Sequence, residues 1–164
     1  MSQTLQAATH EHHSRLTWHV DHLPMLGDRI GAVSFDELAQ GVDESVAFLN
    51  GLLIPHLEAA EHTIYPELER MLQNRHSMAP MRREHAEIRQ LVSDLVDLQT
   101  TLDGAQLSTG HAVALRRVIF RLYALLKIHL AEEELYIDIL EHGVSAEAGA
   151  ALAAAMEHSG IPLA

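Results

Sequence analysis

Thirteen histidines and no cysteine occur in this 164-residue chain, so any metal that it holds must be bound by imidazole and carboxylate. Nitrogen and oxygen donors without sulfur suit iron, manganese or zinc. His129 and Glu133, in the segment HLAEEEL, are four residues apart, which places both side chains on one face of a helix. The spacing indicates a pair of metal ligands; the alternative is a buried His–Glu hydrogen bond that only packs two helices.

Other histidines fall into an internal repeat. His13 and His56 are separated by 43 residues and His85 and His129 by 44 residues, which indicates two helical hairpins with one histidine on each arm. His12 shares an apolar stripe with its neighbours and stays an alternative to His13 on the first arm. The apolar residues that follow the first histidine of each hairpin have the same spacing: Leu16, Val20 and Leu23 in one, Ile88, Val92 and Leu95 in the other.

Long helices must position these side chains. Helix-forming residues fill the stretches between sparse Gly and Pro, and apolar residues recur at spacings of three and four. Ser34 and Glu37 predict a capping box at one helix start, and Pro24 predicts a kink. The predicted helices run from about Gln3 to Ile30, from Phe35 to Gln73 with interruptions at Pro55 and Pro66, from Pro80 to Leu102 with a stop at Asp103-Gly104, and from the cap Ser108 to His142.

The predicted fold is all-α: an up-down-up-down four-helix bundle over residues 1–144, with a short C-terminal helix in the Ala-rich residues 145–164. Within each hairpin the two histidines differ by roughly one helical turn in their position along the bundle axis, and kinks at the prolines can compensate for this difference. We therefore expect the four imidazoles in one buried layer. Burying so many unpartnered ring nitrogens is costly, and a bound metal removes that cost.

The composition argues against several other functions. Acidic side chains outnumber basic ones 23 to 11, and the net charge of −12 repels the phosphates of nucleic acids and of anionic lipids. The sequence has neither a leader pattern nor an apolar run of about 18 residues. We expect a cytoplasmic protein with no nucleic-acid or membrane partner, and a homodimer is compatible with the apolar content.

The order of the motifs resembles the hemerythrin-like, or HHE cation-binding, domains over roughly residues 10–142. That family has a lone histidine on its first and third helices, a histidine followed by a carboxylate on the second, and His-x-x-x-Glu on the fourth. The matching stretches here are His13, HLEAAEHTIYPELERML, REHAEI and HLAEEEL. The resemblance implies the following metal ligands: His13, His56, Glu61, His85, His129 and Glu133.

Two positions depart from the family pattern. Ala60 stands where the second helix commonly has a glutamate four residues after its histidine, and Glu61 follows one residue later. Some members of the family bridge their metals from that later position; a site with one bridge or one metal is the alternative. Arg89 stands where oxygen-carrying hemerythrins have a second histidine on the third helix, which argues against reversible oxygen transport.

The resemblance implies two iron ions, bridged by a carboxylate and an oxo group, that bind or react with O₂, peroxide or NO. We expect a catalase-like or other oxidative-stress role, with His19 and Tyr136 as candidate acid–base residues. The alternatives are a non-enzymatic iron- or oxygen-sensing or oxygen-binding module, and a helical packing protein without metal. Metal content separates the last of these from the others.

Overall fold

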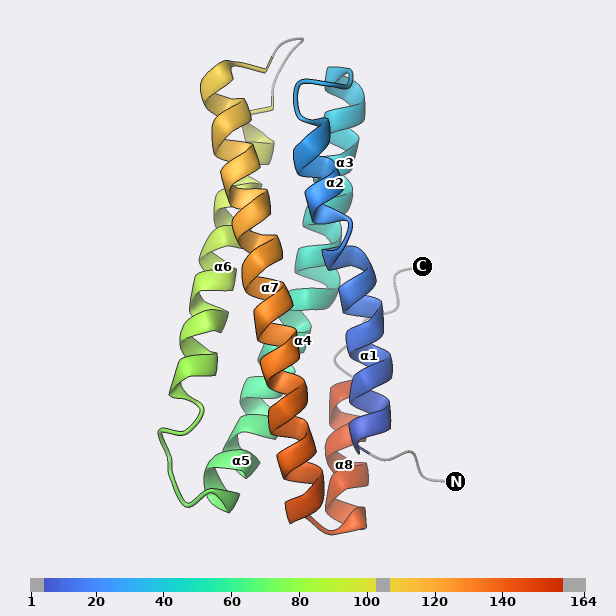
Figure 1. The fold of residues 1–164 in the computed structure, drawn as a ribbon, viewed down its shortest axis with the longest axis vertical. Helices are drawn as coiled ribbons and strands as arrows, with labels where there is room; N and C mark the ends of the chain where they lie inside the picture. Colours follow the sequence, from blue (N-terminus) through green and yellow to red (C-terminus); the bar gives the residue numbers. More distant parts are fainter. Residues whose placement is uncertain (1–4, 103–106, 158–164) are drawn as a thin grey trace.

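The computed structural model describes residues 5–102 and 107–157, and these form helices joined by turns, with no strand among them. The predicted all-α class is therefore confirmed. The chain makes four arms that alternate in direction, and the short helix α8 (Ala146–Glu157) packs beside α1 at the lower end (Figure 1). The described helices outnumber the predicted ones because two arms are broken into shorter pieces. The predicted stop at Asp103-Gly104 lies outside the described residues.

The first arm is divided between α1 (Leu5–Val20) and α2 (Leu23–Arg29). The break falls at Asp21 and His22, just before the predicted kink. Pro24 lies in the first turn of α2, where a proline is tolerated because the N–H groups of that turn have no partner within the helix. The break sets the direction of α2 separately from that of α1, which carries His12 and His13.

The second arm is one helical path with two wider π turns. It comprises α3 (Phe35–Phe48), η1 (Leu49–Leu53), α4 (Ile54–Ala59), η2 (Ala60–Ile64) and α5 (Tyr65–Met71). Each π segment ends two residues before a proline, Pro55 or Pro66. A proline lacks the N–H for the α-helical bond, and its ring collides with the carbonyl four residues back; a π turn relieves both problems. The predicted interruptions at these prolines are therefore π turns within a continuous arm.

The third and fourth arms are α6 (Ala79–Thr100) and α7 (Thr109–Gly143), close to their predicted bounds. Two predicted helix starts are confirmed. Ser34 and Glu37 form the capping box, with the Glu37 carboxylate 3.0 Å from the Ser34 backbone N. The Ser108 hydroxyl accepts from the backbone N–H of His111 at the start of α7.

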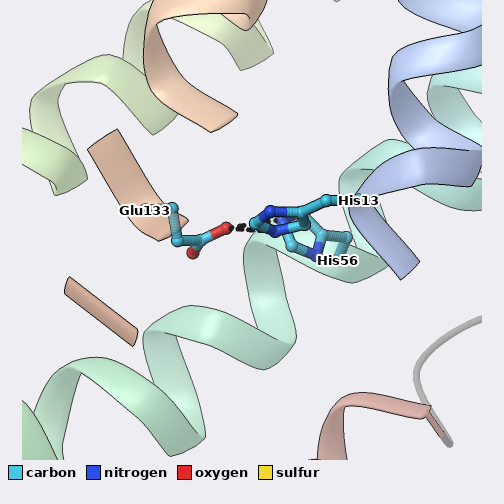
Figure 2. Close-up of side chains that lie close together, drawn as sticks. All are labelled: His13, His56 and Glu133. Carbon is cyan, nitrogen blue, oxygen red and sulfur yellow. Dashed lines mark hydrogen bonds and ion pairs between the residues drawn. The ribbon is translucent and has the colours of Figure 1, made fainter. Parts of the chain in front are cut away.

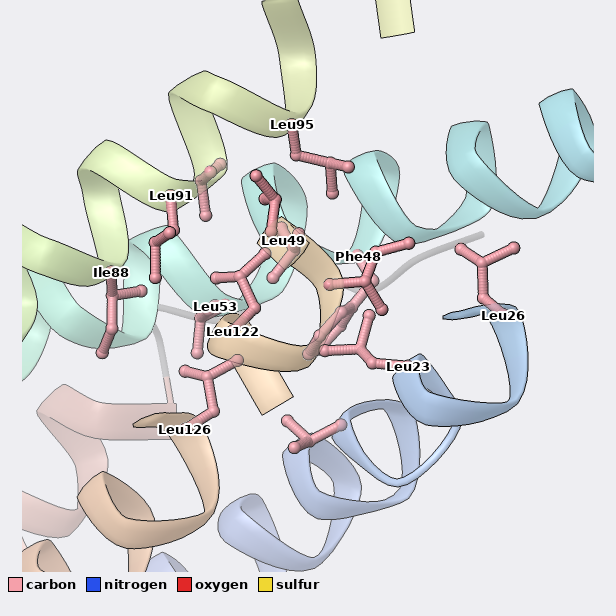
Figure 3. Close-up of a cluster of buried hydrophobic side chains, with 14 of the residues drawn as sticks. Leu23, Leu26, Phe48, Leu49, Leu53, Ile88, Leu91, Leu95, Leu122 and Leu126 are labelled. Atoms are coloured by element: carbon pink, nitrogen blue, oxygen red, sulfur yellow. The ribbon is translucent and has the colours of Figure 1, made fainter. Parts of the chain in front are cut away.

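The apolar core has two parts, separated by a polar layer. The larger cluster fills the upper bundle and includes Leu49, Leu53, Leu122 and Leu126 (Figure 3). The smaller cluster fills the lower end and includes Ile64, Leu68, Met81 and Ile137, with Ala153 of α8 against it. The layer between them contains the predicted ligands. No helix in the described part of the chain is long and apolar enough to cross a membrane.

Candidate metal centre

Glu133 of α7 occupies the centre of the polar layer. Its Oε2 lies 3.1 Å from Nε2 of His13 on α1 and 2.9 Å from Nε2 of His56 on α4 (Figure 2). The three side chains are 0–2% exposed, so their contacts are shielded from water. Their nearest ligand atoms lie within 4.8 Å of one another, close enough to hold one metal ion.

A second group on the other side of Glu133 is formed by His85 of α6 and His129 of α7. The two Nε2 atoms are 3.1 Å apart, and with a Glu133 oxygen they also lie within 4.8 Å of one another. Both histidines are fully buried. The two His–His–Glu groups share the carboxylate of Glu133.

Tyr65, at the start of α5, also points into this centre. Its hydroxyl donates to Oε1 of Glu133 at 3.1 Å and lies 2.9 Å from Nε2 of His85. Burial, reinforced by the charge of Glu133, raises the pKa of Tyr65 far above its ordinary value, so the phenol is protonated at neutral pH. Sequence spacing does not single out this tyrosine; its nearest signal is the Tyr-Pro pair that follows HLEAAEHTI.

Two carboxylates outside the centre orient the second pair of histidines. Nδ1 of His85 is 2.7 Å from Oε1 of Glu61, and Nδ1 of His129 is 3.0 Å from Oε2 of Glu84. Burial lowers the pKa of both histidines to about 4, so each carries a single ring proton at neutral pH. A ring nitrogen facing a carboxylate must donate, so that proton is on Nδ1 in both rings.

The Nε2 atoms of His85 and His129 are consequently both lone-pair acceptors, although they face each other at 3.1 Å. Nε2 of His13 and Nε2 of His56 donate to the Glu133 carboxylate from the other side. Beside the His85–His129 pair, the Tyr65 hydroxyl is the only proton donor among the described groups, and it also contacts Oε1 of Glu133. Acceptors that converge with too few donors repel one another unless a cation lies between them. The donor set therefore fits a metal ion.

The charge state of Glu133 fits the same interpretation. Burial opposes its ionisation, but the neighbouring imidazoles of His56 and His13 hold its pKa well below the usual range. The residue is therefore an anion in a dry layer, which is the state that a metal ligand requires.

The first pair of histidines is anchored less firmly than the second. Neither Nδ1 of His13 nor Nδ1 of His56 has a hydrogen-bond partner in the described part of the protein, and Glu134 Oε1 lies 3.5 Å from the former. His12 is buried beside them, with its ring centroid 5.0 Å from that of His56, but it belongs to neither ligand group. The structure brings His13, not His12, to the carboxylate of Glu133.

Of the six predicted ligands, the structure brings five together: His13, His56, His85, His129 and Glu133. Glu61 lies outside the two His–His–Glu groups, where its carboxylate contacts Nδ1 of His85 and also pairs with Arg89 at 2.9 Å. Arg89, at the position where oxygen-carrying hemerythrins have a second histidine, thus binds the Glu61 carboxylate that orients His85. The two acid–base candidates lie elsewhere: His19 stacks on Phe48, and Tyr136 packs on the lower apolar cluster.

Comparison with known proteins bears on this site. The sequence model of the hemerythrin HHE cation-binding domain matches residues 4–134, which include all five converging ligands and Tyr65. No curated protein and no solved structure matches the chain. The matched segment spans most of the sequence and ends just after Glu133, so the chain belongs to the hemerythrin HHE cation-binding domain family.

Proposed function

We propose that the chain binds two iron ions, one at His13 and His56 and one at His85 and His129, with Glu133 bridging them. The iron-loaded protein would react with O₂, peroxide or NO. The reaction we favour is the catalase-like conversion of two hydrogen peroxide molecules to two water molecules and one O₂. Iron would supply the redox chemistry.

One observation carries the proposal. Two pairs of histidines share the single buried carboxylate of Glu133, and Glu61 and Glu84 leave lone pairs on His85 and His129 where a cation would lie. Imidazole and carboxylate donors without sulfur favour iron, manganese or zinc over magnesium or calcium. The carboxylate shared by two groups favours a pair of ions over one.

The surrounding side chains support chemistry on a small molecule. The apolar clusters above and below the polar layer keep bulk water away, which strengthens electrostatic interactions inside the site. Tyr65 holds a proton 3.1 Å from the Glu133 carboxylate, so it is placed to act as an acid–base group at the proposed centre.

Metal analysis of the purified, iron-loaded protein tests the binding part of this proposal. We expect two irons per chain in the wild type, less than one in His129→Ala and Glu133→Ala, and two in His142→Ala. His142 is the matched control because it is an exposed histidine on the same helix. Zinc alone, or iron retained in the Glu133→Ala variant, would contradict a di-iron site bridged by that residue.

Oxygen release from added peroxide tests the catalytic part. We expect the iron-loaded wild type to release O₂ over many turnovers, and the metal-depleted protein and the Glu133→Ala variant to release none above background. If the di-iron protein leaves peroxide intact but changes its absorption spectrum with O₂ or NO, a sensing or oxygen-binding role replaces the catalase-like one.

A further inference from the structure

Helix α7 has an apolar outer face that the bundle leaves uncovered. Five of the eight exposed large apolar side chains among the described residues belong to this helix, and Ile128 and Leu135 are the most exposed of the five, at 56% and 68%. The helix lies between α6 and α1 in the bundle (Figure 1). We call this face the α7 stripe; with the exposed alanines between the larger residues, it consists of Val113, Phe120, Ala124, Ile128, Ala131 and Leu135.

The stripe has the geometry of a helix-pairing surface. Successive members are seven, four, four, three and four residues apart, so they follow one line along the helix. Ala124 and Ala131 are the small members, and they lie near its middle. Small side chains there let two helix axes approach to about 8 Å, the lower end of the usual packing distance.

Charges along α7 are segregated by sign. The part of the helix up to Lys127 carries all of its Lys and Arg side chains, and the part after Lys127 carries all of its carboxylates. The helix dipole favours the reverse order, so the segregation does not serve the stability of the isolated helix. In an antiparallel pair of α7 helices, the basic half of each copy would lie against the acidic half of the other. The cations are Arg116, Arg117, Arg121 and Lys127, and the carboxylates are Glu132, Glu133, Glu134, Asp138 and Glu141.

We propose that the chain forms a two-fold symmetric dimer in which the α7 stripes of two copies pack antiparallel, with the axis between Lys127 and Ile128. In this register Phe120 lies opposite Leu135 of the second copy, and Arg117 lies opposite Asp138 of the second copy. Lys127 does not obstruct the axis, because its ammonium group is turned to Asp21 at 3.0 Å.

The register matches three of its layers by size or by sign. The large Phe120 meets the large Leu135, the small Ala124 meets the small Ala131, and a cation meets an anion one turn further out. A symmetric pair repeats each of these contacts twice. With a contact about 40 Å long and about 12 Å wide, each copy buries roughly 500 Å², below the usual size of a stable interface. The dimer is therefore weak, and it exchanges with monomer at micromolar concentrations.

Sedimentation velocity of the metal-loaded protein between about 1 and 300 μM tests for the dimer. We expect the mass to rise from 18.2 kDa towards twice that value as the concentration increases. Leu135→Glu should remain monomeric throughout. Leu72→Glu is the matched control and should dimerise as the wild type does, because Leu72 is an exposed leucine that follows α5, away from the stripe. A wild-type monomer at 300 μM would overturn the proposal.

Single cysteines test the register, since the chain has none of its own. In the antiparallel pair the two copies of Ile128 flank the axis, whereas the two copies of Val113 are about 43 Å apart. Under mild oxidation Ile128→Cys should form a disulfide-linked dimer and Val113→Cys should not. Equal cross-linking of both variants indicates a parallel pair, and cross-linking of Val113→Cys alone indicates another surface; either result refutes the register.

Charge reversal tests the same register without cross-linking. Arg117→Glu places two pairs of like charges in its own dimer, and so does Asp138→Arg, so each variant alone should be monomeric. Mixing the two should restore a heterodimer, because both charge pairs then become complementary. A mixture that stays monomeric while the wild type dimerises would show that Arg117 and Asp138 do not face each other. The restored heterodimer would also show that both variants are folded.

Discussion

Glu84 provides a test of how the centre is held, because it touches no candidate metal position directly. Its carboxylate accepts from Nδ1 of His129 at 3.0 Å and thereby fixes the proton of that ring away from the metal side. Glu84→Ala removes the acceptor and leaves every candidate ligand in place. His129 can then carry its proton on Nε2, where it would have to be displaced before a metal binds.

The size of the effect follows from the contact. Loss of an outer carboxylate from a histidine ligand typically weakens metal binding by about 10- to 100-fold, or roughly 1.4–2.7 kcal/mol. The Glu84 side chain is 23% exposed, so water partly replaces the lost acceptor. We therefore expect the lower part of this range, a loss of about 10- to 30-fold in the affinity of the position held by His85 and His129.

The assay is an anaerobic competition for Fe(II) between the protein and a coloured chelator. Glu87→Ala is the matched control, because Glu87 lies three residues further along α6 and its carboxylate pairs with Arg121 at the surface. We expect this control to bind iron within about twofold of the wild type, since exposed ion pairs contribute little. Circular dichroism of both metal-free variants should match that of the wild type.

Wild-type affinity in Glu84→Ala would refute the idea that this carboxylate sets the proton position of His129. An equal loss in Glu84→Ala and Glu87→Ala would assign the effect to the packing of α6 instead. A loss in the first variant alone, without a change in helicity, is the result that the structure predicts.

Three further predictions concern Tyr65, the buried histidines and the cap of α3. Tyr65→Phe should retain iron but release oxygen from peroxide at least about tenfold more slowly, because it removes the nearby proton donor; an unchanged rate at full iron occupancy would contradict that role. Metal-free protein should lose stability as the pH falls from 6.5 to 4, since burial lowers the pKa of His85 and His129 to about 4 and the unfolded chain therefore binds more protons in this window. Urea titrations at pH 7 and pH 4.5 measure the loss, which should be on the order of 2 kcal/mol per histidine between these two pH values, and equal stabilities would show that these rings are not desolvated. Ser34→Ala should lower the free energy of unfolding by about 1 kcal/mol, because it removes the capping box with Glu37. Chemical denaturation measures this value, and Ser108→Ala provides a comparison at another capped helix start.

The arms and the histidine layer were predictable because they depend on periodicity. Apolar spacings of three and four define helices that bury one face, and Ser34 and Ser108 are caps whose hydrogen bonds are local. The repeated distances from His13 to His56 and from His85 to His129 place four imidazoles at similar levels. These features need only the regular rise and rotation of an α-helix.

Tyr65 could not be found in this way. It is nine residues after His56, which on a regular α-helix is the opposite face of the arm. The π turn of η2 (Ala60–Ile64) accommodates one extra residue, so Tyr65 takes roughly the position of an eighth residue, on the same side as His56. The position of Glu61 against Nδ1 of His85 was equally hidden, since it depends on how α6 packs on the second arm.

The π turn lets the length of the chain vary here without moving the side chains of the centre. Because the turn already accommodates one extra residue, deletion of one residue within Ala60–Ile64 would convert it to a regular α-helix in which Tyr65 is the eighth residue after His56. Tyr65 would then keep its place beside Glu133, whereas insertion of one further residue would rotate it by about 100° away from that face. Homologues that lack one residue here are thus expected to keep a tyrosine eight residues after the histidine, and single-residue deletions in this segment should be tolerated better than insertions.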